Sequence, residues 1–162
     1  ADNPTFTARD LGEFSRDLID DVMPMIERLY RVKRDADARA IAGLSMGGNQ
    51  ARQIGLGRQD LFHYIATFSG SMGVVGGTAN GNTIRQTFAN VFDNPEETNG
   101  TIRLFWASAG SEEAGLLASH KLLNSLFDSH RVRHTFTTYP GGHTWHVWRR
   151  SLRDLLPLLF QK

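Results

Sequence analysis

The sequence predicts an α/β fold in which one parallel β-sheet is flanked by helices. Two observations predict it: short apolar segments alternate with longer amphipathic segments, and turn-forming residues separate them. This alternation is typical of strand–helix–strand units, whose right-handed crossovers place consecutive strands side by side. The length of 162 residues fits one domain, so we expect residues 1–162 to form a single unit.

Four segments are expected to be strands: 39–44, 64–69, 102–109 and 134–139. The first three are short and largely apolar, whereas the side chains of 134–139 alternate in character. Five segments are expected to be helices: 8–31, 46–56, 83–92, 114–129 and 145–160. In 8–31, 114–129 and 145–160 the apolar residues fall on one helical face, and 46–56 follows a turn of small residues. Pro24 lies inside the first of these helices and should kink it. Residues 70–81 are rich in glycine, which predicts a loop. One interpretation is that this loop borders the substrate pocket.

Composition and charge exclude several classes of function. Lysines and arginines are scattered and the formal net charge is +1, so we expect no nucleic-acid partner and no membrane surface. No run of about 18 apolar residues occurs, so no transmembrane helix is expected. The chain has no cysteine, which excludes disulfides, thiolate nucleophiles and cysteine-ligated metal sites.

A Gly-x-Ser-x-Gly motif spans residues 43–47, between a predicted strand and a predicted helix. A sharp turn there exposes the hydroxyl of Ser45 at the C-terminal edge of the sheet. We expect that a Cβ at Gly43 or Gly47 would collide with its neighbours. The helix dipole favours negative charge at this turn, and the backbone N–H of Met46 is the expected oxyanion donor. A phosphate-binding loop is the less favoured interpretation, because no Gly-Lys-Ser/Thr follows.

His143 is the candidate general base among six histidines. In an arrangement with chain order serine, acid, histidine, the base lies on a loop after the last strand. His143 follows the fourth predicted strand and the turn formed by residues 140–142, Pro-Gly-Gly, whose glycines let the loop bring the imidazole over the sheet edge. His146 is interpreted as a surface or packing residue. The remaining histidines, at positions 63, 120, 130 and 134, lack such a turn.

The acid should follow the strand that precedes the histidine. Residues 110–113, Gly-Ser-Glu-Glu, come directly after the third predicted strand, and either Glu112 or Glu113 could orient the imidazole. We favour Glu113. Asp93 is a weaker candidate, because it follows a predicted helix instead of a strand.

Four separated segments resemble, in order, the Putative esterase family of α/β-hydrolases, which includes feruloyl, acetyl-xylan and enterochelin esterases. They are residues 40–48 around the motif, 61–62, 68–70, and 142–145 with the Trp-Arg pair at 148–149. The resemblance implies that Ser45 is the nucleophile, His143 the base and Met46 an oxyanion donor. The acid segment of that family commonly reads Gly-x-x-Asp, and Glu113 stands at its last position.

The resemblance also implies an α/β-hydrolase-type sheet whose N-terminal strands are missing from this chain. The second oxyanion donor normally comes from a loop among those strands, and losing one donor costs about 2.7–4 kcal/mol. Residues 39–44 would also become an unpaired sheet edge. We therefore expect that the chain does not work as an isolated monomer. Either a missing N-terminal segment or a second copy would pair with the exposed edge.

The expected function is a serine carboxylic ester hydrolase with a Ser-His-Glu triad, which acts on short acyl, acetyl-xylan or feruloyl esters. No metal and no organic cofactor is expected. Trp145 is the candidate substrate-binding residue, whereas Trp148 is interpreted mainly as a packing residue. The resemblance suggests an extracellular location. The alternatives are an acyltransferase with the same triad, a catalytically silent fragment that assembles with a missing N-terminal part, and an unrelated phosphate-binding domain.

Overall fold

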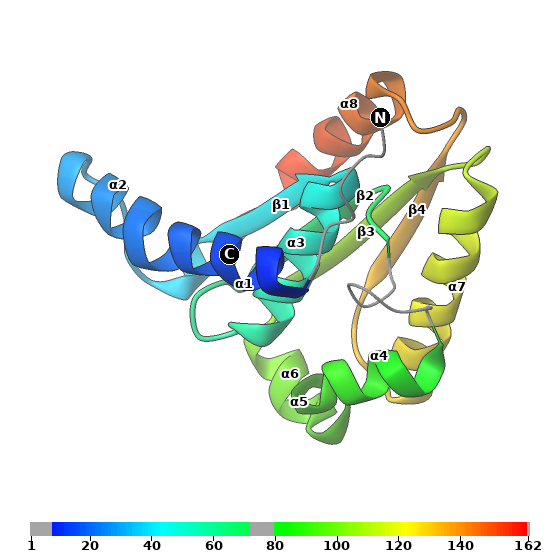
Figure 1. The fold of residues 1–162 in the computed structure, drawn as a ribbon, viewed down its shortest axis with the longest axis horizontal. Helices are drawn as coiled ribbons and strands as arrows, with labels where there is room; N and C mark the ends of the chain where they lie inside the picture. Colours follow the sequence, from blue (N-terminus) through cyan, green and yellow to red (C-terminus); the bar gives the residue numbers. More distant parts are fainter. Residues whose placement is uncertain (1–7, 72–79, 162) are drawn as a thin grey trace.

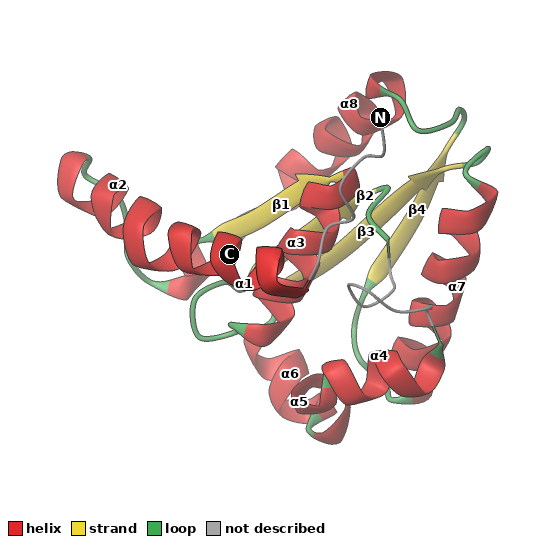
Figure 2. Ribbon diagram, in the orientation of Figure 1, coloured by secondary structure: helices red, strands yellow, loops and turns green. Residues whose placement is uncertain are grey.

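A four-stranded parallel sheet forms the centre of the fold (Figures 1 and 2). The computed structural model describes residues 8–71 and 80–161. The strands stand in sequence order, β1-β2-β3-β4, and each neighbouring pair is parallel. Their bounds are β1 Ala40–Leu44, β2 Tyr64–Phe68, β3 Leu104–Gly110 and β4 Thr135–Tyr139. The predicted parallel sheet and its strand order are confirmed.

Helices connect the strands and cover both faces of the sheet (Figure 2). Before and after β1 they are α1 Ala8–Arg16, the π-helix η1 Asp17–Val22, α2 Met23–Leu29, the 3₁₀-helix η2 Ala36–Ala38 and α3 Ser45–Gly57. After β2 they are α4 Gly81–Thr87, α5 Ala89–Asp93, α6 Pro95–Thr101, α7 Ala114–Ser129, α8 Trp145–Leu155 and the 3₁₀-helix η3 Leu156–Leu158.

The sheet separates two hydrophobic cores, because successive side chains of a strand point to opposite faces. Ile65 of β2 belongs to the larger core, with apolar residues of α3, α5 and α7. Ala66 and Phe68 belong to the smaller core, with Val147 and Trp148 of α8. All five residues of β2 are buried, which explains why this strand is apolar throughout and does not alternate.

The N-terminal helical segment follows the prediction over most of its length but changes its hydrogen-bond pattern before the proline. It continues from α1 through the π-helix η1 into α2, where Pro24 is one of the first helical residues. Proline has no N–H to donate and its ring displaces the preceding carbonyls, so irregular winding just ahead of Pro24 has a direct cause. In Figure 1 this segment extends away from the sheet beyond β1.

Three helical predictions differ from the structure in detail. The helix expected at 83–92 is two helices, α4 and α5, because the backbone at Phe88 leaves helical geometry. Helix α6 was not expected, since its sequence, PEETNGT, has no apolar periodicity; it begins with a proline and two acidic residues that suit a helix N-terminus. The last helix ends at Leu155 and tightens into η3 around Pro157. Of the loop expected at 70–81, residues 72–79 lie outside the described part.

Candidate active site

The predicted nucleophile turn lies between β1 and α3. Ser45 begins α3 with a positive φ of 53°, which marks the sharp change of direction after the strand. A Cβ on Gly43 would lie 2.1 Å from the carbonyl oxygen of Gly47, so glycine is required at position 43. The same expectation for Gly47 is wrong, because a Cβ there meets nothing within 4 Å. The second close approach is at Gly48, whose Cβ would lie 2.7 Å from Thr67 Oγ1.

The structure brings three predicted residues into one hydrogen-bonded chain. Ser45 Oγ lies 2.8 Å from His143 Nε2, although 98 residues separate them in sequence. His143 Nδ1 is hydrogen-bonded in turn to Glu113 Oε1. An ionised carboxylate can only accept, so Nδ1 must carry the proton that it donates to Glu113. That tautomer leaves Nε2 free to accept the proton of the Ser45 hydroxyl.

Glu113 is held firmly below the imidazole. It is 8% exposed, and its Oε2 accepts hydrogen bonds from Ser69 Oγ at 2.7 Å and from the backbone N–H of Gly110 at 2.5 Å. Burial alone would raise the pKa of the Glu113 carboxyl. The donors around the carboxylate, His143 included, outweigh burial and hold this pKa below its ordinary value. Glu113 is therefore ionised at neutral pH.

The two other acid candidates lie elsewhere. Glu112 is exposed at the turn after β3, and its backbone N–H donates to the carbonyl of Gly141. Asp93 ends α5 and forms an ion pair with Arg85 at 2.8 Å. Of the three acids weighed from the sequence, Glu113 is the one whose carboxylate reaches the imidazole.

The loop that carries His143 depends on the predicted glycine turn and on a tryptophan of α8. Gly141 has a φ of +122°, a conformation that side chains disfavour. The Trp148 ring packs edge-on against the imidazole of His143, with ring centroids 4.9 Å apart. Trp145 begins α8, is 64% exposed and packs edge-on against Trp148 at 5.3 Å. His146 is exposed, as expected.

Met46 is the second residue of α3, so its backbone N–H belongs to the first turn of the helix. N–H groups of a first helical turn have no partner within the helix, and no side chain caps this N-terminus at Leu44. Such N–H groups together with the helix dipole favour an anion. The position of Met46 beside Ser45 is therefore suitable for an oxyanion donor.

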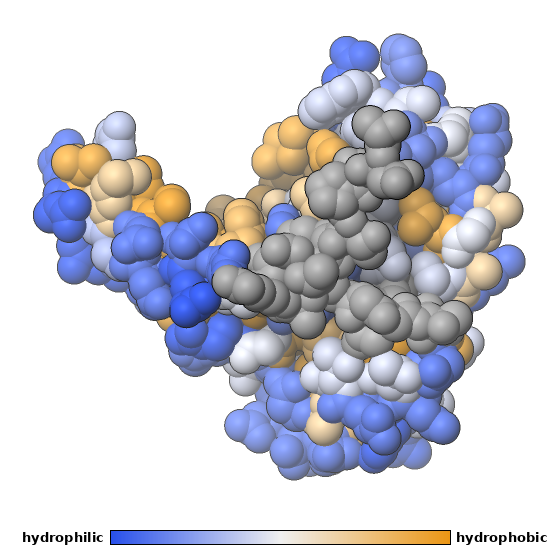
Figure 3. All heavy atoms as spheres, viewed as in Figure 1, coloured by the Kyte–Doolittle hydropathy of each residue, from blue (hydrophilic) through white to orange (hydrophobic). Residues whose placement is uncertain are grey.

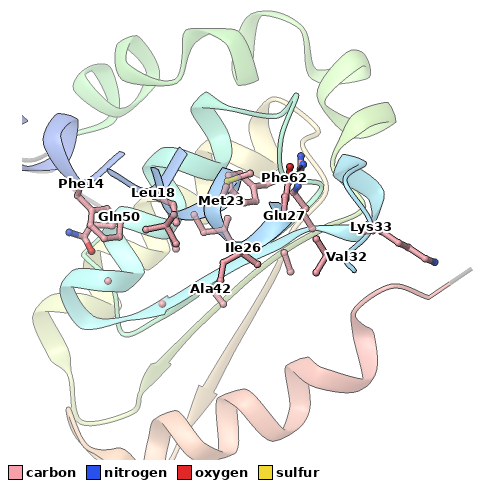
Figure 4. Close-up of a pocket in the computed structure, with 18 residues that line it drawn as sticks. Phe14, Leu18, Met23, Ile26, Glu27, Val32, Lys33, Ala42, Gln50 and Phe62 are labelled. Carbon is pink, nitrogen blue, oxygen red and sulfur yellow. Dashed lines mark hydrogen bonds and ion pairs between the residues drawn. The ribbon is translucent and has the colours of Figure 1, made fainter. Parts of the chain in front are cut away.

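A groove of about 510 Å³ leads to this turn (Figure 4). Its walls come from α1, η1 and α2 on one side and from β1 and α3 on the other; the apolar side chains include Phe14, Leu18 and Ile26. Gly43 and Gly47, which flank Ser45, also line it. The groove lies along the outer edge of β1. This edge is open because, among the described residues, β1 pairs only with β2.

Metal ligation and membrane insertion find no support in residues 8–71 and 80–161. Within these ranges no group of three or more His, Asp or Glu side chains is placed to hold a metal ion. None of the helices described there is both long enough and apolar enough to cross a membrane.

Comparison with known proteins identifies the family. Residues 8–159 match the model of the family described as Putative esterase. The chain belongs to this family. It is 31% identical over 158 residues to an endo-1,4-beta-xylanase/feruloyl esterase from Xylanibacter ruminicola, covering 96% of this chain and 18% of that protein. It is 29% identical over 169 residues to an uncharacterized protein from Corynebacterium glutamicum, covering 94% of this chain and 39% of that protein.

Solved esterase structures share the fold of this chain, which is the α/β-hydrolase fold. A ferulic acid esterase matches with a TM-score of 0.72 and 26% identity, covering 91% of this chain and 60% of that chain. A ferulic acid esterase from Anaeromyces mucronatus, solved with ferulic acid, matches with a TM-score of 0.76 and 19% identity. The match covers 99% of this chain and 60% of that chain. This chain thus spans 18% and 39% of the two curated relatives and 60% of each of these two solved chains.

Ser69 is a site residue that the sequence does not reveal. Its side chain reaches Glu113 because the backbone turns at a positive φ of 49° directly after β2. Neither the φ value nor the direction of a hydroxyl can be derived from residue type. The available signal is its place in the chain: Ser69 directly follows the buried strand β2, at the same sheet edge as Ser45.

Proposed function

We propose that this member of the esterase family is a serine carboxylic ester hydrolase, with Ser45 as nucleophile, His143 as general base and Glu113 as the acid that orients His143. One observation carries the proposal: a continuous hydrogen-bonded chain runs from the Ser45 hydroxyl through both imidazole nitrogens to a buried carboxylate. A hydroxyl is a weak nucleophile unless a base removes its proton as it attacks, and this arrangement supplies that base.

The reaction is acyl transfer to water in two halves. Ser45 Oγ attacks the ester carbonyl while its proton passes to His143 Nε2, and a tetrahedral intermediate forms. His143 then donates this proton to the leaving alcohol, which departs and leaves an acyl group on Ser45. A water molecule, deprotonated by His143, attacks the acyl-enzyme, and the second tetrahedral intermediate releases the acid as His143 returns the proton to Ser45 Oγ. Glu113 stays ionised throughout and stabilises the imidazolium.

The negative oxygen of each tetrahedral intermediate needs hydrogen-bond donors. The backbone N–H of Met46 is the proposed donor, because it belongs to the first turn of α3 beside the reacting serine. The N-terminal dipole of α3 acts in the same direction.

The proposed substrates are esters of short acyl, acetyl-xylan or feruloyl type. The most similar curated relative described above carries feruloyl esterase in its name, and a solved relative was obtained with ferulic acid. Trp145 is the proposed substrate contact, because a largely exposed indole two residues from His143 offers a flat surface to an aromatic acyl group.

A second polypeptide segment is proposed to cover the groove along β1. Among the described residues the outer edge of β1 pairs with no other strand, and the groove walls are mostly apolar. Figure 3 shows hydrophobic surface on both sides of the hollow between α2 and the body of the molecule. Because Gly43 and Gly47 line the groove, a segment seated there would adjoin Ser45 and could supply the second oxyanion donor. The segment is either an N-terminal part of a longer protein or a second copy of this chain.

An ester panel tests the proposed function. Wild type, Ser45→Ala, His143→Ala and His146→Ala are compared on p-nitrophenyl acetate, p-nitrophenyl butyrate and methyl ferulate. We expect the first two variants to lose hydrolysis and His146→Ala to keep it, because His146 is a neighbouring exposed histidine outside the hydrogen-bonded chain. Hydrolysis by Ser45→Ala at the wild-type rate would refute the proposal.

A further inference from the structure

Ser69 is a buried serine that takes no direct part in the proposed reaction. It is 1% exposed and lies directly after β2, with φ in the left-handed region. A non-glycine residue keeps this conformation only where its surroundings enforce it. Here the Ser69 N–H donates to the carbonyl of Ser108 in β3 at 2.7 Å, which fixes the turn. The turn directs the Ser69 side chain toward the acid of the site.

The direction of the Ser69 hydroxyl proton is determined by its two partners. Trp148 Nε1 lies 3.0 Å from Ser69 Oγ, and an indole N–H can only donate, so the hydroxyl oxygen accepts there. The hydroxyl proton is therefore left for Glu113 Oε2, 2.7 Å away. Trp148 thus fixes the orientation in which Ser69 donates to the carboxylate.

Trp148 also touches the base itself. Its ring packs edge-on against the His143 imidazole at an interplanar angle of 89°. His143, Glu113, Ser69 and Trp148 therefore form a closed ring of contacts: the acid and the base are joined once by their own hydrogen bond and a second time through Ser69 and Trp148. A ring of this kind restricts both the carboxylate and the imidazole.

We propose that Ser69 and Trp148 are positioning residues that hold the Glu113 carboxylate in the orientation His143 requires. This inference rests on the proposed function of Ser45, His143 and Glu113. Neither positioning residue transfers a proton. Without the Ser69 hydroxyl, Glu113 Oε2 keeps only the N–H of Gly110 and the carboxylate gains freedom to rotate. The loss should therefore appear in the chemical step and not in substrate binding.

The test compares Ser69→Ala with a matched control, Ser108→Ala. Ser108 is also fully buried at the same end of the sheet, and its hydroxyl is hydrogen-bonded to Ser151 Oγ at 2.8 Å, away from the triad. Both variants lose one buried hydroxyl, so their melting temperatures should fall by similar amounts. We expect Ser69→Ala to lower kcat by up to about 100-fold with little change in KM, because small misplacements of reacting groups have effects of that size. Ser108→Ala should keep the wild-type kcat.

Proton NMR gives a second measurement, the chemical shift of the His143 Nδ1 proton, which a general loss of stability would not change. The proton between His143 Nδ1 and Glu113 should resonate far downfield in the wild type and in Ser108→Ala. In Ser69→Ala we expect this resonance to shift upfield or to vanish through exchange with water. Trp148→Phe keeps a ring against His143 but removes the N–H, so it should shift the resonance in the same direction with a smaller loss of kcat. It also carries the test if Ser69→Ala does not fold.

The outcomes separate this inference from the proposed function. If Ser69→Ala or Trp148→Phe matches Ser108→Ala in both kcat and the downfield resonance, the positioning role is overturned while the triad stands. Ser45→Ala is measured in parallel: full hydrolysis by that variant would overturn the nucleophile, and the positioning role with it.

Discussion

The two oxygens of the Glu113 carboxylate have different partners. Oε1 accepts from the imidazole of His143, whereas Oε2 accepts from Ser69 and from the Gly110 N–H. Glu113 lies inside the turn after β3 and Glu112 lies outside it, which explains why only one of the two adjacent glutamates contacts the imidazole. The sequence alone favoured Glu113 over Glu112 and kept Asp93 as a weaker candidate, but which side chain turns inward depends on the packing of the turn.

Glu113→Gln should abolish most of the proposed activity. A neutral amide can donate to Nδ1, so the imidazole would adopt the wrong tautomer and lose its ability to accept the serine proton. We expect kcat to fall by about 10⁴-fold, the size of the effect when a triad acid becomes its amide. Glu112→Gln is the matched control and should keep kcat. Equal kcat values for the two variants in p-nitrophenyl acetate hydrolysis would contradict the assignment.

The two glycines of the Gly-x-Ser-x-Gly motif should respond oppositely to alanine. Gly43→Ala places a Cβ 2.1 Å from backbone of Gly47, so we expect it to lower the free energy of unfolding by about 1–3 kcal/mol or more. Gly47→Ala fills open space within a helix and should leave stability unchanged or raise it by about 0.5–1 kcal/mol. Urea denaturation of both variants measures the difference. Equal destabilisation by Gly43→Ala and Gly47→Ala would contradict the geometry described for the turn at Ser45.

At the scale of elements, strands were easier to predict from the sequence than short helices. Three of the strands are short apolar segments and β4 is rich in threonine and aromatic residues, which favour strands. Parallel pairing in sequence order follows from the right-handed crossovers. Helix α6 has one buried residue, Thr98, and therefore no apolar periodicity to detect. The groove could not be predicted from residue types either, because it depends on where α1, η1 and α2 lie relative to β1.

Helix α7 contains a buried histidine that should make stability depend on pH. His120 is 1% exposed and stacks on Phe136 of β4. Burial, with the nearby charge of Arg52, lowers the pKa of His120 to about 4. In the unfolded chain a histidine titrates near 6.5, so the unfolded state binds a proton first as the pH falls. Stability contributed by neutral His120 is therefore present above about pH 6.5 and is lost toward pH 4.

Replacing this histidine tests the pH dependence. Between pH 7 and pH 5 we expect the wild-type free energy of unfolding to fall by about 2 kcal/mol through His120. His120→Phe, which keeps a ring on Phe136, should lose that part of the dependence. His146→Gln is the control, because His146 is exposed. Urea denaturation at both pH values measures the free energy of unfolding. The same pH dependence in wild type and His120→Phe would contradict the expectation.

At the scale of the whole molecule, the proposed assembly rests on the outer edge of β1, which is unpaired among the described residues, and on the mostly apolar groove beside it. The groove-lining Ile26 is 37% exposed, and its neighbour Met25, which does not line the groove, is 42% exposed. If a second copy covers the groove, the chain should elute in size exclusion above its 18.1 kDa mass, and Ile26→Lys should shift it toward the monomer. Met25→Lys, on the same helix, should not. A stable monomer with full esterase activity would contradict the proposed covering segment.

Covalent labelling shows whether His143 activates Ser45, on which the proposed mechanism depends. A fluorophosphonate reacts with an activated serine, and intact mass with peptide mapping locates the adduct. We expect one adduct on Ser45 in the wild type, none in Ser45→Ala, and strongly slowed labelling in His143→Ala. Labelling of Ser45 at the same rate with and without the His143 imidazole, or no adduct on Ser45 at all, would contradict it.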